Sequence, residues 1–166
     1  MFPRAAIMTM PRDTWLTTRG VGHVRGVGLA REMADDDDAL GAFFEAQELA
    51  DAGDAEEAAK LFAAVAADAR DGSVPAWLLR SVALNSLAEL HIDRAVAAGF
   101  PFAAAGEAAR AADDAAAALQ RSLRAWPSNA QARMSLALLA RDRGQPSTAL
   151  RHWLAVPQAI PTIPAA

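Results

Sequence analysis

The chain has 166 residues, a formal net charge of −4, no cysteine and an apolar content of 53%, much of it alanine. This length suits one domain with a hydrophobic core, and the mild acidity disfavours nucleic-acid binding. The absence of cysteine excludes a disulfide framework, a thiolate nucleophile and a cysteine-bound metal. Tyrosine is absent and alanine favours helix, so we expect no β-rich fold. No long apolar run lacks a charge or a helix breaker, so we also expect no membrane span.

Residues 1–32 show no sustained hydrophobic period and are basic, with prolines early and glycines late. We interpret them as a disordered basic arm. Two alternatives stay open: an organelle transit peptide, or a natural start at Met33. The run that begins at Gly20 and Gly22 fails as a dinucleotide-binding loop, because Arg25 occupies the third glycine position. We expect the protein in the cytoplasm.

A helical hairpin is predicted over residues 38–52 and 55–69. Gly53 can adopt the left-handed conformation that ends a helix. Asp54 can cap the following helix, and Glu57 can reach back to the Asp54 amide. Four aspartates precede this hairpin and favour the positive end of the first helix dipole. Their consecutive spacing does not fit a calcium-binding loop.

Four further helices are predicted by apolar residues that recur at three and four positions. Ser73 is a plausible cap for the third helix, and Ser128 with Gln131 forms a capping box for the fifth. We expect these helices at about residues 74–97, 102–125 and 129–143, and then from Pro146. Pro157, Pro161 and Pro164 are expected to end the last helix and leave an extended tail over residues 158–166.

The opening pattern recurs near the end of the chain. Gly144, Ala149 and Trp153 repeat the offsets of Gly53, Ala58 and Phe62, and Val156 matches Val65. A glycine turn, a small residue and then an aromatic residue four positions later suit two closely packed helices.

These residues resemble the tetratricopeptide repeat family. The two glycines lie 144 − 53 = 91 residues apart, whereas two regular repeats would place them about 68 apart. The resemblance covers about residues 38–157. It implies an all-α superhelix of about three antiparallel hairpins, with the middle hairpin lengthened, in a domain of residues 33–157.

The sequence supplies little for catalysis. His23, His91 and His152 stand in no metal-binding or nucleophile motif, and no phosphate loop occurs. We therefore predict no enzyme activity, no cofactor and no metal site.

The resemblance implies recognition of a peptide or a partner helix on a concave surface lined by the first helix of each hairpin. Phe43, Leu84 and Met134 can equally be core residues. The alternative functions are a regulatory or substrate-docking domain of a larger enzyme, and a self-associating helical bundle. The candidate lining residues are Phe43, Gln47, Arg80, Leu84, Asn85, Arg133 and Met134.

Overall fold

The computed structural model describes residues 38–71, 74–101 and 105–159. Within these ranges every regular element is an α-helix. The predicted arm over residues 1–32, the proposed cap Ser73 and the tail beyond residue 159 lie outside them. The helices are α3 (Asp38–Ala52), α4 (Ala55–Asp68), α5 (Ala76–Ala97), α6 (Glu107–Ala125), α7 (Ala130–Asp142) and α8 (Pro146–Ala159).

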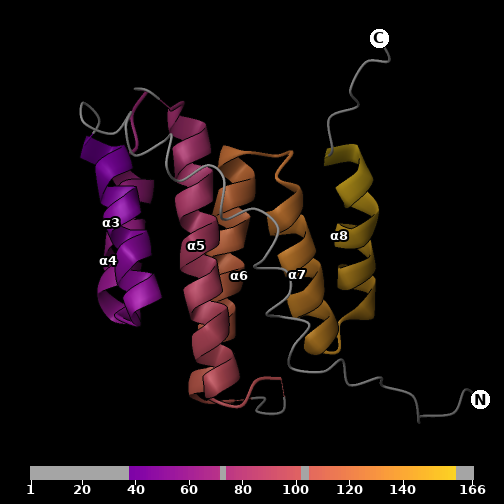
Figure 1. The fold of residues 1–166 in the computed structure, drawn as a ribbon. Helices are drawn as coiled ribbons and strands as arrows, with labels where there is room; N and C mark the ends of the chain where they lie inside the picture. The colour runs from indigo at the N-terminus through magenta and orange to yellow at the C-terminus, as the bar shows by residue number, and fades with distance from the viewer. Residues whose placement is uncertain (1–37, 72–73, 102–104, 160–166) are drawn as a thin grey trace, which may run out of the picture.

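The helices form three antiparallel hairpins that stand side by side, with α3 and α4 at one end of the row and α8 at the other (Figure 1). Each helix packs mainly on the helices next to it in sequence. The middle helices α5 and α6 have 22 and 19 residues, whereas the outer helices have 13 to 15. The predicted all-α hairpin fold with a lengthened middle hairpin is confirmed.

A left-handed glycine ends the first helix of each hairpin. At Gly53, where φ is 90°, the glycine N–H donates to the Ala50 carbonyl at 3.1 Å, and the Asp54 N–H donates to the Leu49 carbonyl at 2.9 Å. The same pair of hydrogen bonds recurs at Gly99 and Gly144, where φ is 99° and 70°. These paired bonds satisfy carbonyl groups that a helix end leaves without partners.

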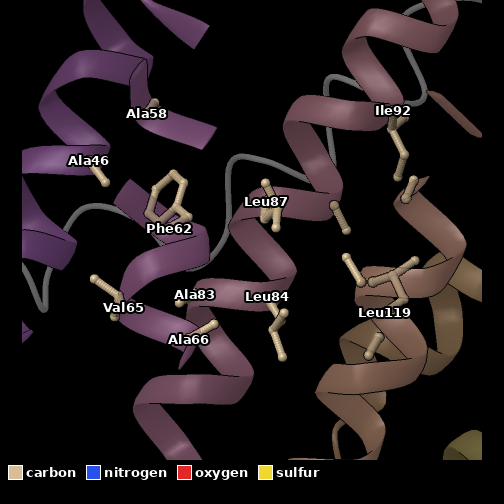
Figure 2. Close-up of a cluster of buried hydrophobic side chains, with 14 of the residues drawn as sticks. Ala46, Ala58, Phe62, Val65, Ala66, Ala83, Leu84, Leu87, Ile92 and Leu119 are labelled. Atoms are coloured by element: carbon tan, nitrogen blue, oxygen red, sulfur yellow. The ribbon is translucent and has the colours of Figure 1, made fainter. Parts of the chain in front are cut away.

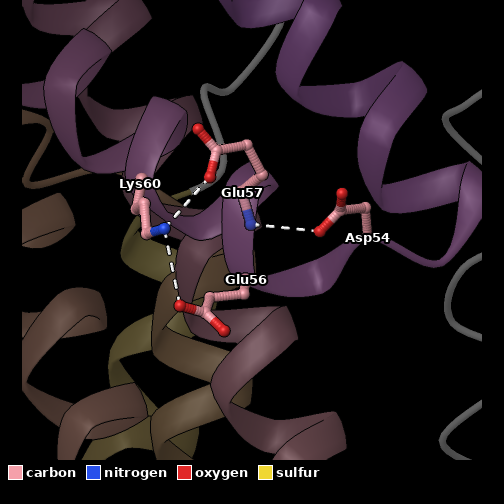
Figure 3. Close-up of polar contacts among 4 residues, drawn as sticks. All are labelled: Asp54, Glu56, Glu57 and Lys60. Carbon is pink, nitrogen blue, oxygen red and sulfur yellow. Dashed lines mark hydrogen bonds and ion pairs between the residues drawn. The ribbon is translucent and has the colours of Figure 1, made fainter.

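The first turn of α4 differs in part from the predicted capping box. Asp54 Oδ1 accepts the Glu57 N–H at 3.4 Å, as expected (Figure 3). The Asp54 amide, however, already donates to Leu49, so the Glu57 side chain cannot serve it. The Glu57 carboxylate instead pairs with Lys60 at 3.0 Å, and Glu56 pairs with the same ammonium at 3.4 Å.

Three other predicted helix ends are corrected by the structure. The cap of α7 is Asn129, not Ser128: Asn129 Oδ1 accepts the Ala132 N–H at 3.1 Å, and Gln131 donates to Glu89 across to α5. Helix α6 starts later than expected, after Gly106. Helix α8 continues to Ala159, because a proline in the final turn removes only one intrahelical hydrogen bond.

Alanines and aromatic rings together close the first hairpin, as predicted. Ala46 and Ala58 are fully buried, and the Phe62 side chain between α3 and α5 is 2% exposed (Figure 2). The centroid of the Phe62 ring lies 5.5 Å from that of Phe43. Because alanine lets two helix backbones approach closely, each large ring fills the space that the small residues leave.

The outer side of α3 is charged where the matching side of α7 is apolar. With the 91-residue offset, Glu45 corresponds to Leu136 and Glu48 corresponds to Leu139. The two glutamates are exposed, whereas the two leucines are buried. Helix α7 packs on α6 ahead of it, and no helix of the described residues precedes α3.

Candidate partner-binding surface

Two of the predicted lining residues belong to the core. Phe43 on α3 is 7% exposed and Leu84 on α5 is 1% exposed, and both are members of the apolar cluster that runs through the hairpins. Their apolar periodicity in the sequence reports burial against neighbouring helices. Both side chains therefore belong to the core, the alternative that the sequence left open, and neither lines an open surface.

Arg80 closes the end of a neighbouring helix. Its Nε donates to the Ala66 carbonyl at 2.9 Å, and its Nη2 donates to the Ala69 carbonyl at 3.2 Å. A cation at a helix C-terminus satisfies free carbonyls and complements the helix dipole. Arg80 thus ties α5 to the end of α4, and both its Nε and its Nη2 donate within the fold.

Asn85 and Arg133 each carry a polar atom with unmet hydrogen-bonding capacity. Asn85 on α5 is 6% exposed, and its Oδ1 has no hydrogen-bond partner among the described residues. Arg133 on α7 is half-buried; its Nη2 donates to the Pro127 carbonyl at 2.8 Å, and its buried Nε has no partner in the same ranges. Gln47 on α3 and Met134 on α7 are also half-buried.

A buried polar cluster that the sequence analysis missed fixes α5, α6 and α7 together. Ser81 Oγ and Ser122 Oγ lie 2.7 Å apart, and Asn129 Nδ2 donates to each of them at 3.0 Å. All three residues are at most 2% exposed. Serines within alanine-rich helices give no signal that two of them will meet across 41 residues of chain, so only the packing shows the cluster.

Helix α8 presents large apolar side chains on one flank. Leu150, Trp153 and Leu154 are 57%, 39% and 64% exposed. The repeated offsets suggest two equally packed hairpins, but Trp153 is not buried as its counterpart Phe62 is, because no helix of the described residues lies against this flank. Trp77 is the other large apolar residue exposed in these ranges, and its ring packs against Trp126 at 5.6 Å.

The two histidines of the described ranges, His91 and His152, both have a lowered pKa. Burial lowers the pKa of His152, and the charges of Arg133 and Arg151 lower it further. Burial also lowers the pKa of His91, although the Asp114 carboxylate partly opposes this. Both shifts favour the neutral form of the imidazole. In the described ranges, no group of three or more histidine or acidic side chains is arranged to hold a metal ion.

Neither the described helices nor the comparisons with known proteins indicate a functional class. None of the helices in the described ranges has the length and apolarity needed to cross a bilayer. No family model matches the chain, and neither a curated protein nor a solved structure shows significant similarity to it. Its function is therefore inferred from its own residues and their packing.

Proposed function

We propose that the chain is a non-catalytic scaffold of tetratricopeptide-like hairpins that binds a segment of another protein. The row of three hairpins supports this proposal, because stacked hairpins expose an extended surface built from successive first helices. The cysteine-free sequence suits a reducing compartment such as the cytoplasm.

The unpaired polar atoms of Asn85 and Arg133 are the observation that carries the proposal. An acceptor on α5 and a donor on α7 both lack partners in the described residues. Buried polar groups are normally hydrogen-bonded, and leaving one unsatisfied costs about 1–3 kcal/mol. A polypeptide backbone has an N–H for the first atom and a carbonyl for the second, and because both atoms are buried it reaches them only when the side chains that cover them move aside.

The two atoms belong to neighbouring first helices. Asn129, at the start of α7, donates to Ser81 of α5, and Gln131 donates to Glu89 of α5. Asn85 lies between Ser81 and Glu89 in sequence, so it belongs to the stretch of α5 that these contacts join to α7. Half-buried Met134, next to Arg133, adds apolar contact on the α7 side.

Affinity capture with cross-linking tests this surface. The full chain, its Arg133→Glu variant and its Arg121→Glu variant would be compared as baits. Arg121 is an exposed residue of α6, so it carries the same charge reversal away from the surface. We expect wild type and Arg121→Glu to retain the same partners and Arg133→Glu to lose them. If folded Arg133→Glu captures the same partners in the same yield, the surface between α5 and α7 is not the binding site.

A further inference from the structure

The flank of α8 corresponds to a flank of α4 that is covered. Ala149, Trp153 and Val156 repeat the offsets of Ala58, Phe62 and Val65. The α4 counterparts, Ala58, Phe62 and Val65, are buried, because α3 lies on one side of α4 and α5 lies on the other. Phe62 is accordingly 2% exposed, whereas its counterpart Trp153 is 39% exposed.

The side chains on this flank of α8 are larger than their counterparts on α4 and are apolar, although they are exposed to water. The half-buried alanines Ala59 and Ala63 of α4 correspond to Leu150 and Leu154 of α8. These two leucines are more than half exposed, and with Trp153 they form a stripe spaced i, i+3 and i+4. That spacing is the pattern with which one helix packs on another. We name Leu150, Trp153 and Leu154 the α8 stripe.

The size of the α8 stripe argues against a second copy of the chain as its occupant. With on the order of 200 Å² for each free side chain, the observed exposures leave about 300 Å² of apolar surface. A stable protein–protein interface buries about 800 Å² on each partner. The stripe alone is too small for that, but it suits the apolar face of one amphipathic helix.

The charge near the α8 stripe indicates which charged side chains the binding partner carries beside its apolar face. From Ala130 to Ala159 the chain has four arginines and one acidic residue, Asp142. Arg141 pairs with Asp142, and Arg143 pairs with Asp113 of α6, which leaves Arg133 on the surface between α5 and α7 and Arg151 beside the α8 stripe. Arg151 follows Leu150 directly, is exposed, and donates to Thr148 Oγ1 at 3.3 Å. A second copy would bring like charges together, whereas acidic side chains would complement them.

We propose that the α8 stripe binds an acidic amphipathic helix of a partner protein. The helix would occupy on α8 the position that α5 occupies on α4, with its apolar residues against the stripe and its carboxylates toward Arg151. This site is separate from the surface between α5 and α7, so either can fail without the other.

The test uses two labelled synthetic helices and fluorescence anisotropy. In both peptides leucine occupies positions i, i+3, i+4 and i+7 of every two helical turns. The remaining positions are glutamate in the acidic peptide and lysine in the basic peptide. The full chain is titrated into each at physiological ionic strength. We expect the acidic peptide to bind at least about tenfold more tightly than the basic one. Leu154→Glu should weaken that binding at least about tenfold, whereas Ala67→Glu, at an exposed position of α4, should leave it unchanged.

Three results would overturn the proposal. Equal binding of the two peptides would indicate unspecific apolar contact, and no binding of the acidic peptide would remove the site. A concentration-dependent dimer in sedimentation, abolished by Leu154→Glu, would identify a second copy as the occupant. Thermal denaturation monitored by circular dichroism confirms that each variant is folded before these measurements are compared.

Discussion

At the scale of single residues, Asn129 connects the start of α7 to both α5 and α6. Its Oδ1 caps α7 through the Ala132 N–H, while its Nδ2 donates to two buried serine hydroxyls. Its carboxamide therefore joins a helix start to a contact between two other helices. Neither aspartate nor serine at this position can accept and donate in the same way.

Replacing Asn129 with alanine should cost about 2–3 kcal/mol of the free energy of unfolding, from the lost cap and the lost donors to Ser81 and Ser122. Urea denaturation measures this change. Ser128→Ala is the matched control, because Ser128 is exposed and does not cap α7. It should change the free energy by less than about 0.5 kcal/mol. The reverse ranking of the two variants would mean that Ser128 is the true cap.

At the scale of elements, the first helix of each hairpin ends at a glycine in the left-handed region. Gly53 has a φ of 90°, whereas Gly41 lies inside α3 with no atom within 4 Å of where a Cβ would stand. A glycine-to-alanine substitution should therefore lower the stability of the protein at Gly53 and raise it at Gly41. A side chain strains the left-handed backbone at Gly53, whereas at Gly41 it favours the helical conformation.

Gly53→Ala should destabilise the protein by about 1–2 kcal/mol through left-handed strain. Gly41→Ala should stabilise it by about 0.5–1 kcal/mol, because alanine restricts the unfolded chain and fits the helix. Thermal and urea denaturation of both variants provide the comparison. A neutral effect at Gly53 would show that the turn relaxes to a different conformation.

The helices could be predicted from sequence because their signals are local. Gly53 and Gly144, the apolar periodicity and the aromatic residues four positions after an alanine each lie within a few residues of what they determine. Which of the candidate lining residues are buried in the core could not be predicted in this way. Apolar periodicity cannot separate Leu84 in the core from Leu154 on the surface, because that difference depends on whether another helix covers the side chain. Arg80 likewise finds its carbonyl acceptors 11 and 14 residues earlier in the chain.

At the scale of the whole molecule, packing is uneven along the row of hairpins. Helix α6 contacts α7 less extensively than it contacts α5, so the last hairpin depends more on the cluster of Ser81, Ser122 and Asn129. In stacked hairpins, units with weaker interfaces open at lower free energy than the rest.

Hydrogen exchange followed by mass spectrometry should therefore separate the last hairpin from the middle one. Amides in the interior of α7 should exchange on the order of tenfold faster than those in the interior of α6. Asn129→Ala should widen this difference, because it removes hydrogen bonds across the junction. Equal protection of α6 and α7 in the wild type would mean that the described helices open as one cooperative unit.

The charged outer side of α3 gives the row of hairpins a direction. An additional hairpin grafted after α8 would meet leucine and tryptophan and could bury them. The same hairpin grafted ahead of α3 would have to desolvate Glu45, which stands where Leu136 makes the equivalent junction inside the row. Modular elongation of this architecture is thus favoured at its carboxyl-terminal face and opposed at its amino-terminal one.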